Sequence, residues 1–192
     1  MLFMNRMIKD IAGVRSGAYL KEVPEGDVFY LQVNHFNREE RSVLLSKPTL
    51  EMNSKTENHL LAEGDLVFAA KGTSNFCSVY RREMGKVVAS SSFLVISITD
   101  RTAVYPDYLC WFLNRDDTIA FLKTNARGTS IPSISKKMIE EYTINIPPMD
   151  VQHKVMEIIQ LQQREQHLYE RIMDLRNKLI QKQLIEIIKY GE

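Results

Sequence analysis

The stretch Ile144-Asn-Ile-Pro-Pro-Met-Asp-Val-Gln152 divides the chain into two parts of different character. Its first residues continue an extended run over 142–146, which stops at two consecutive prolines because proline lacks the backbone N–H that a regular element needs. Asp150 is a favourable N-cap residue, and neither glycine nor proline follows it before residue 191. The sequence therefore predicts a body over residues 1–149 and a second part, residues 150–192, formed by one helix that ends near residue 190.

This helix would be about 60 Å long at 1.5 Å per residue, and its apolar residues recur at spacings of three and four, as in a coiled coil. Glu165 interrupts the stripe once, and beyond residue 179 the stripe shifts by one position. The opposite face is charged, which favours a partner helix over the alternative of a helix lying along its own domain. The predicted seam consists of Ile158, Leu161, Leu168, Ile172, Leu175 and Leu179.

The body combines strand and helix patterns. Short β-branched and aromatic runs at 28–33, 66–70, 78–80 and 92–98 predict strands separated by glycine-containing turns. Residues 66–70 show no alternation and should be buried on both faces, whereas Tyr30, Gln32 and Asn34 alternate with apolar residues and should form a polar face. Residues 107–114 and 116–125 predict two short helices, and Ser135 should cap a third. The fold class is therefore α+β, a mixed domain with a multi-stranded sheet and short helices, followed by one long C-terminal coiled-coil helix.

Composition limits the function classes. The 25 Lys and Arg residues against 24 Asp and Glu give a net charge of +1, so any nucleic-acid partner must be recognised through local charge. Cys77 and Cys110 lie in apolar contexts without paired spacing, which is typical of buried thiols in a reducing compartment. The N-terminus does not resemble a signal peptide, and no apolar run is long enough to span a membrane. We expect a soluble, cytoplasmic protein.

The sequence lacks the motifs of an independent enzyme. The four histidines have no metal-ligand spacing, and the phosphate-binding, dinucleotide-binding and nucleophile-elbow motifs are absent, so we expect neither a metal site nor catalytic residues. Many metal-dependent nucleases have an Asp or Glu two residues before a lysine in their active sites. No lysine in this sequence has an acidic residue at that position. The amino-methyltransferase signature is also missing, because Asn145-Ile-Pro-Pro-Met149 has an inserted isoleucine and no aromatic residue.

Two turn-rich segments, residues 66–82 and 123–137, carry several cations and no acidic residue. Each combines a cation, a glycine that permits close backbone approach, and short hydroxyl or amide groups, a set that suits phosphate oxygens and groove edges. Gln32 and Asn34 are further candidates, from the polar face of the first strand. The predicted DNA-binding residues are Gln32, Asn34, Lys71, Thr73, Ser74, Asn75, Arg81, Arg82, Arg127, Thr129, Ser130 and Lys136.

Four segments, in their order and spacing, resemble the DNA specificity subunit of type I restriction-modification systems. These are Leu61-Ala-Glu-Gly-Asp-Leu-Val-Phe-Ala-Ala-Lys-Gly-Thr73, Tyr108-Leu-Cys-Trp-Phe-Leu113, Gly128-Thr-Ser-Ile-Pro-Ser-Ile134 and Ile144-Asn-Ile-Pro-Pro-Met-Asp-Val-Gln152. Such subunits have two target recognition domains, each followed by a helix, and the two helices pack antiparallel. This chain has one copy. The resemblance thus implies a half-subunit that forms a homodimer through residues 150–190 and reads an interrupted palindrome.

The resemblance also implies partners. A specificity subunit binds double-stranded DNA and docks DNA methyltransferase subunits, and through them a restriction subunit. S-adenosylmethionine, ATP and Mg would then be bound by those partners and no cofactor by this chain. The alternative is a coiled-coil interaction protein, or a truncated specificity fragment, that binds methyltransferase subunits without reading DNA.

Overall fold

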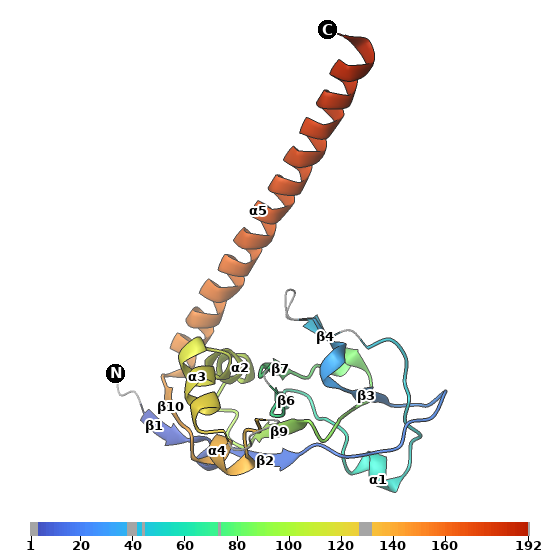
Figure 1. Ribbon diagram of the computed structural model, residues 1–192. Coiled ribbons are helices and arrows are strands. Elements are labelled where there is room, and N and C mark those ends of the chain that lie inside the picture. The colour runs from blue at the N-terminus through green and yellow to red at the C-terminus, as the bar shows by residue number, and fades with distance from the viewer. Residues whose placement is uncertain (1–3, 38–41, 44, 73, 127–131, 192) are drawn as a thin grey trace. The chain divides into compact units, whose positions relative to one another are not determined.

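The computed structural model describes residues 4–37, 42–43, 45–72, 74–126 and 132–191, and the chain divides into two compact units, Met1–Gln152 and His153–Glu192. The first unit contains every strand and the four shorter α-helices among these residues (Figure 1). The second consists of the remainder of one long helix. The fold is mixed α+β, as the sequence predicts.

The first unit is built on a four-stranded antiparallel sheet in the order β2 (Ala12–Ser16), β9 (Phe93–Ile98), β6 (Leu66–Ala69) and β7 (Cys77–Val79). All four residues of β6 are buried, which confirms the burial predicted from its unbroken apolar run. Leu66 and Val67 pair with Ile96 and Val95 of β9, so the most apolar strands lie at the centre of the sheet.

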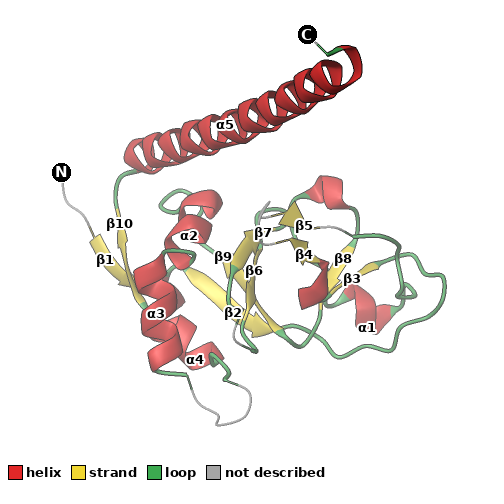
Figure 2. Ribbon diagram, turned by 45° about the horizontal axis from the view of Figure 1, so that its top comes forward, coloured by secondary structure: helices red, strands yellow, loops and turns green. Residues whose placement is uncertain are grey.

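Three two-stranded pairings flank this sheet (Figure 2). Strand β3 (Phe29–Leu31) is parallel to β8 (Val87–Ala89). Strand β1 (Met4–Met7) is antiparallel to β10 (Thr143–Ile146). Strand β4 (Phe36–Asn37) is antiparallel to β5 (Ser42–Val43). The α-helices are α1 (Ser54–Glu57), α2 (Pro106–Leu113), α3 (Asp116–Thr124), α4 (Lys136–Glu141) and α5 (Met149–Tyr190), and the 3-10 turns are η1 (Ile8–Asp10), η2 (Val33–His35) and η3 (Arg82–Met84).

The prediction of a polar face on the first strand is wrong at Tyr30. This side chain is only 6% exposed, and its hydroxyl donates to the Ala18 carbonyl at 2.8 Å. Strand β3 ends at Leu31, after which η2 turns the chain, so residues 30–34 do not share one alternating surface. A tyrosine can be buried in this way because its hydroxyl has a partner.

The helices follow their predicted positions closely. Ser135 caps α4 by accepting a hydrogen bond from the Met138 N–H at 3.3 Å, as predicted. Helix α5 begins at Met149, two residues before the first helical position that Asp150 as N-cap implies, so Asp150 lies in its first turn. A carboxylate in that position still interacts favourably with the helix dipole. Cys77 is buried as predicted, whereas Cys110 is only partly buried.

Candidate nucleic-acid interface

The two acid-free basic segments meet beside the end of β6. The Gly72 N–H donates to the Pro132 carbonyl at 3.0 Å, and the Ile134 N–H donates to the Ala70 carbonyl at 2.9 Å, which makes Lys71 and Ser133 an isolated antiparallel bridge. Gly72 has φ of +91°, a backbone conformation that side-chain-bearing residues rarely adopt. The sequence predicted each segment separately, and the backbone pairing brings them to one place.

The end of β3 lies next to the same loop. The rings of Phe36 and Phe76 stack with their centroids 3.6 Å apart, and Phe76 also meets the buried Phe93 edge-on at 6.1 Å. The Ser90 N–H donates to the Leu31 carbonyl at 2.9 Å and so holds the end of β3 against the turn that precedes β9. We define the recognition face as the described residues of segments 32–36, 71–76 and 132–136.

Within the recognition face, several predicted side chains already have partners. The Asn75 amide donates to the Ala69 carbonyl at 2.9 Å and closes the loop, while the Gln32 amide donates to the Glu22 carboxylate at 2.6 Å. Lys136 forms an ion pair of 3.4 Å with Glu140, one turn along α4. Asn75 and Gln32 therefore help to hold the surface in shape.

Lys136 is exposed despite its ion pair, and two further predicted side chains of the recognition face are exposed as well. Lys71 and Asn34 are exposed, and Ser74 is partly exposed. Thr73, Arg127, Thr129 and Ser130 lie outside the described residues. Ser133, His35 and Phe76 were not among the predicted DNA contacts. Ser133 reaches this surface through its backbone pairing with Lys71, whereas His35 and Phe76 are close neighbours in sequence of the predicted residues Asn34 and Asn75. The His35 ring accepts a hydrogen bond from the Gln32 N–H at 3.2 Å.

Arg81 and Arg82 lie at the opposite end of the β6–β7 hairpin. Val79 pairs with Leu66 at the start of β6, whereas Lys71 follows the end of that strand. The Arg81 guanidinium forms ion pairs of 2.5 Å with Asp107 and 3.4 Å with Glu63, so two carboxylates balance its charge. These contacts tie the end of β7 to the first turn of α2, while the length of the β6–β7 hairpin separates Arg81 from the recognition face.

The contacts of the Glu63 carboxylate should make the stability of the fold depend on pH. A hydrogen bond from the Arg82 N–H, supplemented by the Arg81 guanidinium, lowers the pKa of Glu63 below its ordinary value. A lowered pKa in the folded state contributes stability above the unfolded-state pKa, and this stability is lost as the pH falls through the folded-state pKa. The midpoint temperature of thermal unfolding should therefore fall less between about pH 5 and pH 3 in Glu63→Gln than in the wild type. Glu83→Gln, an exposed change on the neighbouring η3, is the control, and equal curves for both variants would contradict the prediction.

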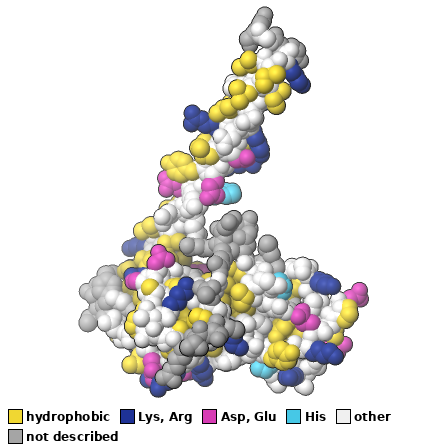
Figure 3. Space-filling model, in the orientation of Figure 1, with side chains coloured by type: hydrophobic (Ala, Val, Ile, Leu, Met, Phe, Trp, Pro, Cys, Tyr) yellow, Lys and Arg dark blue, Asp and Glu magenta, His cyan; other side chains and the backbone are white. Residues whose placement is uncertain are grey.

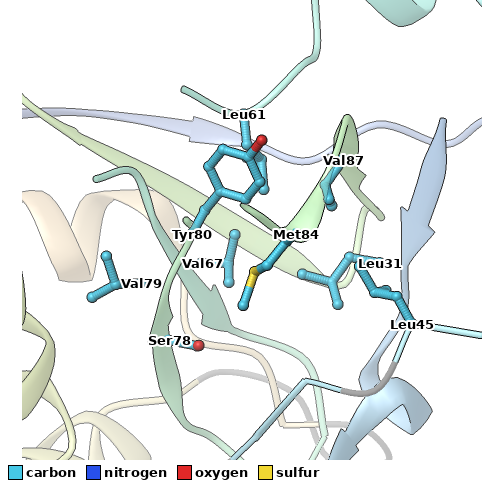
Figure 4. Close-up of a pocket in the computed structure, with 9 residues that line it drawn as sticks. All are labelled: Leu31, Leu45, Leu61, Val67, Ser78, Val79, Tyr80, Met84 and Val87. Carbon is cyan, nitrogen blue, oxygen red and sulfur yellow. The ribbon is translucent and has the colours of Figure 1, made fainter. Parts of the chain in front are cut away.

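One cavity of the first unit is apolar and too small to hold more than a water molecule. This cavity, lined by Leu31, Val67, Tyr80 and Val87, among others, lies between the β3–β8 pair and the main sheet (Figure 4). Its volume is about 10 Å³, about the space of one water molecule, and its lining is almost entirely apolar. In the described chain no three His, Cys, Asp or Glu side chains are grouped so that they could hold a metal ion.

Helix α5 carries an uncovered apolar stripe. Apolar side chains follow one another along this helix (Figure 3), and the six residues of the predicted seam are each between 50% and 65% exposed. Charged residues elsewhere on the helix pair along it, for example Lys178 with Asp174 at 2.8 Å. No helix within the described ranges is long and apolar enough to cross a bilayer.

Comparison with known proteins gives a consistent result. A family model described as "Type I restriction modification DNA specificity domain" matches residues 2–174. The type I restriction enzyme MjaVIII specificity subunit of Methanocaldococcus jannaschii is 28% identical over 153 residues, which cover 79% of this chain and 33% of the relative. The chain thus spans about one third of that relative's length.

Solved structures share the fold. The S subunit of a type I restriction-modification system from M. genitalium superposes with a TM-score of 0.60 at 15% identity, covering 83% of this chain and 38% of that chain. The HsdS subunit of Thermoanaerobacter tengcongensis gives a TM-score of 0.57 at 12% identity, with coverage of 84% and 38%. At these identities the likeness establishes the fold.

Proposed function

Because this chain belongs to the family of type I restriction-modification DNA specificity domains, we propose that it recognises a DNA sequence through the recognition face and presents that DNA to DNA methyltransferase subunits. The observation that carries the proposal is the convergence of two acid-free basic segments, paired through Gly72 and Pro132. Exposed Lys71 would position the phosphate backbone, while Asn34 and Ser74 have the donors and acceptors that base edges require.

The proposal assigns binding and positioning to this chain. Methyl transfer and cleavage, with S-adenosylmethionine, ATP and Mg, would occur on methyltransferase and restriction subunits of a cytoplasmic assembly. The exposed stripe of α5 supports a homodimer, because a second copy would present the same stripe and cover it. Two identical recognition faces related by a twofold axis would then read two inverted half-sites separated by a spacer.

The salt dependence of DNA binding tests this proposal. We expect the purified chain to bind duplex DNA with an affinity that falls steeply between about 50 and 200 mM salt, because each phosphate contact contributes about −0.9 to the slope of log affinity against log salt. Fluorescence anisotropy with a randomised duplex measures the non-specific term, and selection from the same library finds the preferred sequence. The absence of salt-dependent binding would favour the alternative function, a coiled-coil protein that binds methyltransferase subunits without reading DNA.

A further inference from the structure

Helix α2 is attached at one end to the first turn of α5. The Gln152 side chain is 0% exposed and makes three hydrogen bonds: it accepts from the Tyr105 N–H at 2.8 Å and donates to the Ala103 and Pro147 carbonyls at 2.7 and 2.8 Å. The Tyr108 hydroxyl donates to the Asn145 carbonyl at 3.0 Å. The residues that precede α2 and its first turn are thus bound to the segment that leads into α5.

The other end of α2 is attached to the strand that leaves the recognition face. Asn114, which follows the last residue of α2, accepts a hydrogen bond from the Cys77 N–H and donates to the Cys77 carbonyl, both at 2.8 Å. Cys77 is the first residue of β7 and follows Phe76 directly. Both backbone groups of Cys77 therefore bond to a single side chain, and this fixes the end of the loop over residues 71–76.

These contacts lie within the first unit and make α2 a rigid connection about 12 Å long, at 1.5 Å for each of its eight residues. We propose that α2 sets the position of the recognition face relative to the first turn of α5, with Gln152 and Asn114 as positioning residues. This inference rests on the proposed function. In a dimer, the two side chains would fix the positions of the two recognition faces, so that the dimer prefers one spacer length between the half-sites.

A change in spacer length is a sensitive probe of this geometry. Adding two base pairs moves one half-site by about 7 Å along the duplex and rotates it by about 70°. We expect the wild-type chain to prefer one spacer length by about 10-fold or more over duplexes that are two base pairs longer or shorter, since a rigid dimer cannot engage both half-sites in them. Asn114→Ala and Gln152→Ala should reduce this preference to about threefold or less, because the recognition face becomes able to shift.

The experiment uses full-length chain and bipartite duplexes selected from a random library, with affinities measured for spacers of every length within three base pairs of the preferred one. Asn58→Ala is the control for Asn114→Ala: Asn58 is exposed and follows the last residue of α1, as Asn114 follows the last residue of α2, and it lies outside both basic segments. Gln160→Ala, an exposed change on α5, is the control for Gln152→Ala.

The outcomes are distinguishable. Loss of the spacer preference in both variants, with both controls unchanged, supports the inference. A uniform loss of affinity at every spacer length, with the preference intact, assigns the two residues a purely structural role and overturns it. A wild-type chain that binds duplex without any spacer preference overturns the two-site reading of the proposed function, and the inference with it. If Gln152→Ala does not fold, Asn114→Ala decides, because Asn114 is only partly buried.

Discussion

Replacing Leu168, Ile172 and Leu175 together by glutamate is expected to convert a dimer into a folded monomer. These residues form the centre of the α5 stripe and are each about half exposed in the single chain. A dimer would bring six carboxylates into its apolar seam, and burying an unpaired carboxylate costs several kcal/mol. The dissociation constant should rise at least about 1000-fold.

Light scattering on the full chain measures this effect directly. The control carries the same three added charges away from the stripe, as Gln163→Glu, Asn177→Glu and Gln181→Glu, and should remain dimeric. Circular dichroism of both variants verifies that the body is folded. A triple variant that stays dimeric would place the interface elsewhere, and the homodimer through α5 would be withdrawn.

Lys71→Glu is expected to weaken DNA binding by about 10- to 100-fold at low salt, because the change removes one phosphate contact and adds a repulsive charge in each copy. In a dimer, two contacts are lost, so the salt slope should become shallower by about two. The stability of the fold should change little, since Lys71 is exposed.

The matched control for this variant is Lys55→Glu, which makes the same charge change at an exposed position on α1. Its DNA affinity and salt slope should stay close to those of the wild type. If both variants lose affinity equally, net charge alone governs binding and Lys71 has no particular place in the interface. Arg81→Gln provides a further comparison, because its guanidinium is already paired with Glu63 and Asp107.

The elements predicted from sequence are those with strong local patterns. Helices α2, α3, α4 and α5 and strands β6, β7 and β9 lie where periodicity and capping residues predict them. Strands β1 and β2 were not predicted, because each is short and owes its existence to a partner far along the chain, as in the pairing of Met7 with Thr143 and of Ala12 with Ile98. Tyr30 was misassigned for a related reason, since its hydroxyl partner belongs to another segment.

The chemistry of the candidate interface divides in the same way. Charge segregation is a property of the order of residues, so the sequence alone identified the two basic segments and the apolar stripe of α5. Which cations share a surface depends on backbone pairing and on distant carboxylates, and only the folded chain decides that Lys71 lies beside residues 132–134 while Arg81 is held by Glu63 and Asp107. Local periodicity and capping act over a few residues, whereas hydrogen bonds and ion pairs between distant segments exist only after the chain has collapsed into one core.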